Sequence, residues 1–285
     1  MAAEDRVLTT DGWRLAVTVD EPEGAVVGTV ILAHAMMCAG RTFSRGFSRA
    51  LTDGGFRTVR FDFRGHGDSG PGAHAGGDWS YDDLVRFDVP AIVAHARATY
   101  GGPLALVGHS LGAHVTAAAL GLGLTQLDGL VLVAGNVWLP RLDLDRARRW
   151  KKRATLATVL TIARAAGRFP ARALRAGSDD EPLRYWLAFE RWWRDDAWTS
   201  DDGRDDYLAA LARVETPALA IASDGDRLNC VPACALRFAA SIAGCERHVI
   251  GGDGAPDHMG LVTRRDAPAA KPALAWLSST VARQG

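Results

Sequence analysis

The sequence lacks several features that define whole classes of protein. It contains 33 basic and 33 acidic side chains in 285 residues, so no charge excess favours nucleic acid or an acidic polymer as a partner. It has no apolar run that could cross a bilayer, and residues 1–11 do not resemble a signal peptide, so we expect a cytoplasmic protein. Among only four cysteines, Cys230 and Cys234 lack a second ligand pair, so we expect reduced thiols and no metal site.

The most informative stretch is Gly108-His109-Ser110-Leu111-Gly112, which directly follows the apolar run Leu104–Val107. It predicts a strand, a sharp turn with Ser110 at its tip, and a helix. The flanking glycines leave room for this turn, because a Cβ at either position would collide with the neighbouring strand or helix. The serine hydroxyl would then lie at a helix N-terminus, which favours developing negative charge. We interpret Ser110 as a nucleophile.

A serine nucleophile needs a base and an acid that orients the base. In the chain order serine, acid, histidine, the candidates are Ser110, Asp226 and His258. Asp226 follows the apolar run 218–222, and His258 lies in a Gly-rich loop after residues 247–250, so both should lie at the C-terminal ends of strands. Asp224 is the competing acid; Asp253 and Asp257 are too near His258 in sequence to reach its far nitrogen.

Further stretches also follow predicted strands: His34-Ala35-Met36, Asp62–Gly70, and Ser223–Arg227 before Val231-Pro232. Together with the serine turn and Asp257–Gly260, they resemble the serine-nucleophile branch of the α/β-hydrolase superfamily, which includes esterases, lipases and S33-like enzymes. The resemblance covers residues 6–137 and 214–281. It implies an α/β fold with a mostly parallel eight-stranded sheet, flanking helices and an inserted helical cap. Ala35 departs from the family pattern, which usually has glycine after the histidine.

The order of the predicted elements agrees with one α/β domain that carries an insertion. A hairpin is expected over residues 6–20, with strands near 29–34, 58–62, 104–108, 129–134, 218–222 and 247–250. Helices are expected at 42–53, 82–99, 112–124, 233–243 and 267–282. Pro90 should start, kink or split the second of these helices.

Residues 138–213 interrupt this alternation, and we interpret them as a helical cap between two parts of the core, residues 1–137 and 214–285. The segment holds six of the nine tryptophans: Trp138, Trp150, Trp186, Trp192, Trp193 and Trp198. They either line a substrate pocket or form the cap's own core, which we favour for any single tryptophan. Basic residues crowd 146–153 and acidic ones follow from 179 to 206. We expect the basic run to be a solvated helix face, partly paired with the acidic half; a membrane-surface patch is the alternative.

The resemblance implies a serine hydrolase for a small or medium carboxylic ester or thioester. His258 would take the proton of Ser110, and Asp226 would orient His258. The backbone N–H groups of Met36 and Leu111 would form the oxyanion hole. We expect no cofactor and make no prediction of oligomeric state. Among the other histidines, we expect His109 in the core, His34 and His66 in structural loops, and His114 packed or facing away from the site. His74 and His95 are expected at the surface.

Other functions remain open. Acyltransferase, carbon–carbon-bond hydrolase and haloperoxidase-like reactions use the same triad. A non-catalytic binding member is disfavoured because no triad residue is missing. A lipase recruited to membranes by the basic run is a third alternative. Reactions that need an aspartate nucleophile are disfavoured because the turn carries Ser110.

Overall fold

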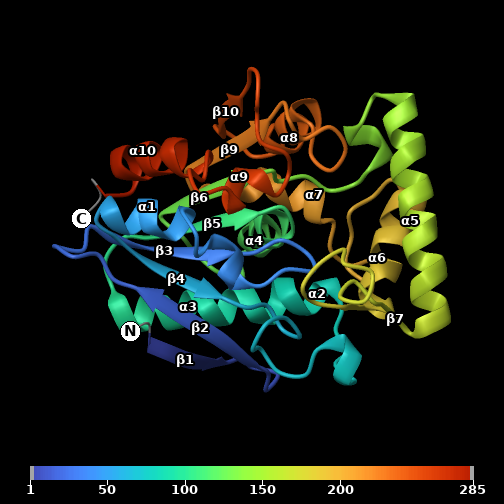
Figure 1. The fold of residues 1–285 in the computed structure, drawn as a ribbon, viewed down its shortest axis with the longest axis horizontal. Coiled ribbons are helices and arrows are strands. Elements are labelled where there is room, and N and C mark those ends of the chain that lie inside the picture. Colours follow the sequence, from blue (N-terminus) through green and yellow to red (C-terminus); the bar gives the residue numbers. More distant parts are fainter. Residues whose placement is uncertain (1–2, 283–285) are drawn as a thin grey trace.

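A computed structural model describes residues 3–282, which form an α/β fold around an eight-stranded sheet (Figure 1). The strand order is β1-β2-β4-β3-β5-β6-β9-β10. The strands are β1 (Ala3–Leu8), β2 (Arg14–Asp20), β3 (Gly28–Ala33), β4 (Phe56–Phe61), β5 (Leu104–His109), β6 (Gly129–Val133), β9 (Ala218–Ser223) and β10 (Glu246–Ile250). The predicted architecture, a mostly parallel eight-stranded sheet with flanking helices, is confirmed.

Burial follows the pairing pattern of the sheet. β1 and β2 form an antiparallel hairpin, and β2 also pairs with β4 antiparallel. The remaining neighbours pair in parallel. Every residue of β3, β5, β6 and β9 is buried, as parallel strands covered on both faces require.

Two helical layers cover the sheet. The helices are α1 (Phe47–Asp53), α2 (Tyr81–Asp83), α3 (Val89–Tyr100), α4 (Leu111–Gly121), α5 (Arg146–Ala166), α6 (Leu183–Asp195), α7 (Tyr207–Ala210), α8 (Pro232–Ala239), α9 (Gly260–Thr263) and α10 (Ala270–Thr280). Alternate strand residues face opposite layers: Val30 and Leu32 pack with side chains of α1 and α10, whereas Ile31 and Ala33 pack with side chains of α3 and α4. Figure 1 shows α1 and α10 on one side of the sheet and α3 on the other.

Some predicted helices are divided in the structure. The helix expected at 82–99 consists of α2, a π-helical turn η3 (Leu84–Asp88) and α3, with Pro90 in the first turn of α3. Pro90 has no N–H to continue the hydrogen-bond ladder, which explains the break. The helix expected at 42–53 is a 3₁₀ turn η1 (Gly40–Phe43) followed by α1, and the one expected at 267–282 is α10 alone.

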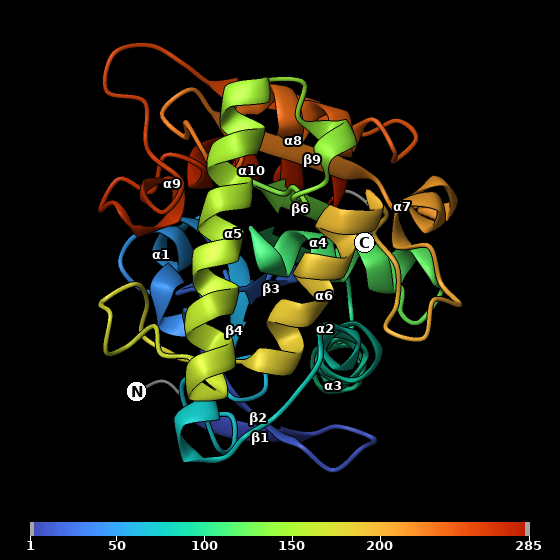
Figure 2. The same ribbon diagram turned by 90° about the vertical axis from the view of Figure 1, so that its right-hand side faces the viewer.

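The segment between β6 and β9 contains most of the elements that interrupt the alternation of strands and helices. It holds η4 (Pro140–Leu142), α5, the short strands β7 (Arg168–Phe169) and β8 (Glu181–Pro182), α6, α7 and η5 (Leu211–Arg213). β7 and β8 form a two-stranded antiparallel ribbon that the sequence did not predict. Figure 2 shows α5 and α6 side by side in front of the sheet, and the two helices pack together.

Candidate active site

Ser110 occupies the strained turn between β5 and α4. Its backbone is in the left-handed half of φ space, with φ 52° and ψ −109°, which is rare for a residue with a side chain. A Cβ on Gly108 would lie 2.4 Å from the Ala113 nitrogen, and one on Gly112 would lie 2.2 Å from the Ala33 carbonyl oxygen. Both glycines are therefore required by close packing, as the sequence predicted.

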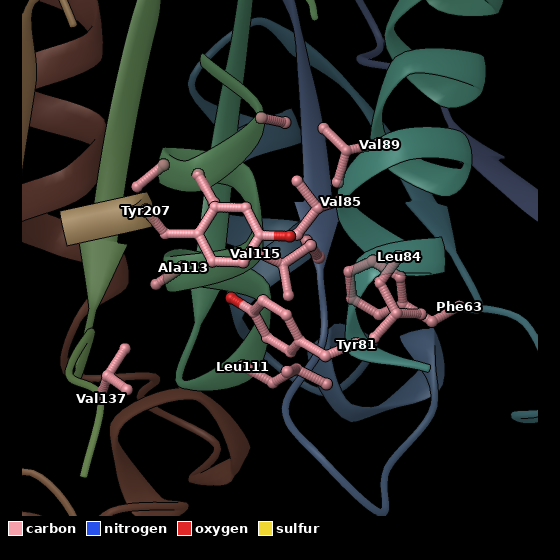
Figure 3. Close-up of a cluster of buried hydrophobic side chains, with 14 of the residues drawn as sticks. Phe63, Tyr81, Leu84, Val85, Val89, Leu111, Ala113, Val115, Val137 and Tyr207 are labelled. Atoms are coloured by element: carbon pink, nitrogen blue, oxygen red, sulfur yellow. The ribbon is translucent and has the colours of Figure 1, made fainter. Parts of the chain in front are cut away.

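The helix that follows Ser110 is held on all sides. Every residue of α4 from Leu111 to Gly121 is buried. Figure 3 shows Leu111 and Val115 beside the aromatic rings of Tyr81 and Tyr207, with Val85 of η3 close by. This packing fixes the position of α4 and thereby the position of the serine turn at its N-terminus.

Asp226 and His258 meet across two loops. His258 Nδ1 lies 2.5 Å from Asp226 Oδ2, which also accepts the Cys230 N–H at 2.9 Å; Asp226 Oδ1 accepts the Asn229 N–H at 3.0 Å. Burial alone would raise the pKa of the Asp226 carboxyl, but the hydrogen bond to His258 and the backbone donors outweigh it and lower the pKa. The carboxylate is therefore ionised beside the histidine at neutral pH.

The competing acids lie elsewhere. Asp226 is 3% exposed, whereas Asp224, Asp253 and Asp257 are all exposed. The Asp257 carboxylate accepts the Gly260 N–H at 2.7 Å and so caps the turn that begins α9. The structure therefore places Asp226 against His258, in the arrangement that the sequence favoured.

Ser110 and His258 both line a cavity of about 760 Å³. Helix α5 contributes Thr155, Leu156 and Val159 to its wall, and α6 contributes Trp186 and Phe189. The cavity is mainly apolar, and among residues 3–282 its lining includes Arg172 and Arg175 but no aspartate or glutamate. A largely apolar cavity of this size that holds a few polar groups is typical of a small-molecule site.

The backbone N–H groups of Met36 and Leu111 are the candidates for an oxyanion hole. Met36 lines the cavity, and Leu111 directly follows Ser110. Within residues 3–282, neither N–H donates to another backbone group. The Gly112 N–H donates to the His34 carbonyl at 3.1 Å, which ties the serine turn to the loop that carries Met36. Ala35 has no positive φ, so alanine there adds no backbone strain.

His114 is closer to the cavity than the sequence analysis expected. It packs, as expected, by stacking on Tyr81, whose hydroxyl lies 2.8 Å from His114 Nδ1, but it also lines the cavity. Burial lowers its pKa to about 3, so it is neutral. The spacing of four residues from Ser110 does not turn His114 away from the site, because residues four apart lie on the same face of a helix.

The remaining histidines have structural contacts. His109 is buried, and its Nε2 lies 2.9 Å from the His258 carbonyl. His34 Nε2 accepts the Phe63 N–H at 2.9 Å, which joins two loops beneath the site. His66 pairs with Glu181, a residue that sequence analysis did not single out. His74 is exposed, as expected, and its Nε2 lies 2.9 Å from an Arg172 nitrogen.

The tryptophans of the inserted segment divide between two environments. Trp192 and Trp198 are fully buried beside Tyr81, whereas Trp138 and Trp186 line the cavity. Trp150 is 72% exposed on α5. Some of these tryptophans therefore line the cavity, and others belong to the buried core of the inserted segment.

Of the six basic residues in the run, three on α5 are exposed: Arg146, Lys151 and Arg153. Two other basic residues, Arg148 and the buried Lys152, both contact Asp143. Asp143 lies near the start of the inserted segment, not in its later acidic half. The Lys152 Nζ also lies 5.5 Å from the centre of the Trp138 ring. Among residues 3–282, no helix has the length and apolar character needed to span a bilayer.

Comparison with known proteins identifies the family. The family model described as serine aminopeptidase, S33, matches residues 24–250, which include most of the sheet and both glycines of the serine turn. This chain belongs to the S33 family of α/β-hydrolases. The S33-family chain is therefore a hydrolase. No curated protein matches its sequence.

Several solved structures share the fold of this S33-family hydrolase. The esterase domain of a Rhodothermus marinus protein is 18% identical, with 98% of each chain covered and a TM-score of 0.63. A thermophilic esterase from Thermogutta terrifontis is 17% identical, with 98% of this chain and 99% of that chain covered and a TM-score of 0.65. The thioesterase domain from the curacin biosynthetic pathway is 18% identical, with 96% and 99% covered and a TM-score of 0.61.

Proposed function

We propose that this hydrolase cleaves a carboxylic ester or thioester through an acyl-enzyme intermediate. The observation that carries the proposal is that Ser110 and His258 line one cavity, while the buried, ionised Asp226 lies against His258. A free hydroxyl is a poor nucleophile at neutral pH, so an oriented base beside it is the feature that makes serine attack feasible.

In this proposal, His258 Nε2 removes the Ser110 hydroxyl proton as Ser110 Oγ attacks the acyl carbonyl carbon. The tetrahedral intermediate collapses, and His258 returns the proton to the leaving alcohol or thiol. Water then attacks the acyl-serine with His258 again as base, which releases the acid and restores Ser110. Asp226 holds Nδ1 of His258 at 2.5 Å and stabilises the imidazolium that forms twice in the cycle.

The N–H groups of Met36 and Leu111 would stabilise the negative oxygen of the intermediate. They suit this role because Leu111 directly follows Ser110 and Met36 lines the same cavity as Ser110, and neither N–H donates to another backbone group within residues 3–282. Removal of one oxyanion donor typically lowers kcat by about 10²–10³. The variant Met36→Pro, which has no N–H at that position, tests the assignment.

We propose further that residues 138–213 act as a cap on a core formed by residues 1–137 and 214–285. Its helices α5 and α6 supply much of the apolar cavity wall. The cavity volume of about 760 Å³ suits a small or medium acyl group. Because the cavity lining within the described part of the chain includes Arg172 and Arg175 but no aspartate or glutamate, we expect neutral or anionic substrates rather than cationic ones.

The test is hydrolysis of p-nitrophenyl esters from acetyl to long acyl chains, with a thioester series in parallel. Ser110→Ala should lower kcat by about 10⁶, the usual effect of removing a serine nucleophile. Ser241→Ala, a serine outside the cavity, serves as the matched control and should keep wild-type activity. Full activity in Ser110→Ala would disprove the proposed mechanism.

A further inference from the structure

The loop that carries Met36 is held by the inserted segment. Met37 has a left-handed backbone, with φ 56°, although it is not a glycine. Its N–H donates to Glu181 Oε1 at 2.8 Å, and its carbonyl accepts the Ser178 N–H at 2.8 Å. A non-glycine residue keeps this conformation only where its surroundings hold it. Both backbone groups of Met37 are thus fixed from residues 178–181.

Glu181 is itself locked in place by a buried partner. Its side chain and that of His66 are both 0% exposed, and His66 Nε2 lies 2.9 Å from the same Oε1 that accepts the Met37 N–H. The other ring nitrogen of His66 faces the Arg64 carbonyl at 2.9 Å, so each nitrogen has an acceptor and the ring is an imidazolium. Burial alone would lower the pKa of His66, but the charge of Glu181 outweighs it and raises the pKa to about 9.

Burying an ion pair costs desolvation free energy, because both ions lose their hydration. The second carboxylate oxygen, Oε2, has no hydrogen-bond partner within the described residues. All of the carboxylate's hydrogen bonds are therefore made at Oε1, where a charged acceptor binds the Met37 N–H more strongly than a neutral one would. Glu181 does not line the cavity, so this contact does not serve substrate binding directly.

We propose that Glu181 is a positioning residue for the oxyanion hole: through the Met37 N–H, it orients the adjacent peptide so that the Met36 N–H points at the reacting carbonyl oxygen. This inference rests on the proposed function. The contact joins β8 of the inserted segment to the loop after β3, so the segment supports the loop that carries Met36 as well as the cavity wall.

Three variants test this role in the full-length protein. Glu181→Leu removes the acceptor and should lower kcat by about 10²-fold, near the lower limit for a lost oxyanion donor. Glu181→Gln keeps a neutral acceptor and should lose about tenfold, a partial rescue. Asp180→Asn is the matched control, because Asp180 lies in the same segment but bonds to Arg168 and to the Arg172 N–H instead. It should stay within about twofold of wild type.

The separation of kcat from KM distinguishes positioning from general disruption. KM should change less than about threefold in both Glu181 variants, because the cavity wall is unaltered. Hydrogen exchange of the Met37 amide should accelerate in Glu181→Leu, which a merely catalytic defect would not cause. Parallel losses in kcat and in substrate binding, or wild-type kcat in a folded Glu181→Leu, would overturn the inference. If Glu181→Leu does not fold, wild-type kcat in Glu181→Gln overturns it.

Covalent labelling by a fluorophosphonate separates this inference from the proposed function. Wild type should be labelled at Ser110, and Glu181→Leu should be labelled about 10²-fold more slowly, because the phosphonyl oxygen uses the same hole. Labelling of wild type with an unchanged rate in Glu181→Leu rejects only the role of Glu181. Absence of Ser110 labelling in wild type rejects the proposed function, and the role of Glu181 with it.

Discussion

Replacement of Asp226 by asparagine is the most discriminating test of the site, because it alters charge with almost no change in volume. Asp226 Oδ2 accepts from both His258 and the Cys230 N–H, while Oδ1 accepts the Asn229 N–H. An amide has only one acceptor oxygen. In either orientation, therefore, its NH₂ group faces a donor, and one orientation would also impose the wrong tautomer on His258.

The size of the effect follows from the charge that is removed. In the transition state of the proposed mechanism, the imidazolium of His258 faces the carboxylate of Asp226, and two unit charges about 4 Å apart attract by about 4 kcal/mol at an effective dielectric constant of about 20. At about 1.4 kcal/mol per tenfold change in rate, this predicts a loss of about 10³ in kcat for Asp226→Asn. KM should change little, because Asp226 does not line the cavity.

The assay is steady-state hydrolysis of the best p-nitrophenyl ester, with Asp224→Asn as the control. Asp224 is two residues away and exposed, so its variant should retain kcat within about twofold. A loss below tenfold in Asp226→Asn, or an equal loss in both variants, would refute the assignment of the acid.

The same carboxylate makes a prediction about stability. The pKa of Asp226 is lower in the folded protein than its ordinary value near 4, so the ionised group stabilises the fold above about pH 4. That contribution is lost as the pH falls through the lowered folded-state pKa. Urea unfolding between pH 6 and pH 3 should therefore show a steeper loss of stability in wild type than in Asp226→Asn.

Three further variants probe the packing around the site. Gly112→Ala should lower the free energy of unfolding by about 3 kcal/mol, because its Cβ would lie 2.2 Å from the Ala33 oxygen. At about 2–4 °C per kcal/mol, Tm in thermal unfolding should fall by about 6–12 °C. An unchanged Tm would contradict the geometry. Lys152→Met should lower the free energy of unfolding by about 1.5–3 kcal/mol in urea, since it removes the 2.9 Å contact with buried Asp143 while Arg148 still holds that carboxylate. Trp186→Ala should raise kcat/KM for long acyl chains over acetyl by about tenfold, and an unchanged ratio would place the acyl group elsewhere.

The sequence predicted those features that depend on local physical rules. The apolar runs form fully buried parallel strands. Pro90 divides its helix because proline has no backbone N–H to donate. The glycines around Ser110 predicted the strained turn, because a Cβ at either Gly108 or Gly112 would collide with neighbouring backbone. Chain order and strand ends were sufficient to propose Asp226 and His258.

The sequence did not reveal contacts between distant segments whose residues carry no local pattern. Glu181 is 115 residues from His66 and 144 from Met37, and it appears in the sequence as one acid in an acidic stretch. His114 looked like a helix residue of no particular role, and its stacking on Tyr81 required the position of α2. Such contacts depend on how the inserted segment folds back on the core, which composition does not determine.

The ribbon formed by β7 and β8 explains why substrate choice and rate should be coupled in this enzyme. Phe169 of β7 lines the cavity, and its register partner Glu181 of β8 holds the loop that carries Met36. A substitution that moves the ribbon to admit a larger acyl group would therefore also shift the Met37 N–H. We expect variants at Phe169 to change kcat together with chain-length preference, whereas variants at Val159, which lines the cavity from α5, should change preference alone. Independent variation of the two properties at Phe169 would show that the ribbon does not transmit this movement.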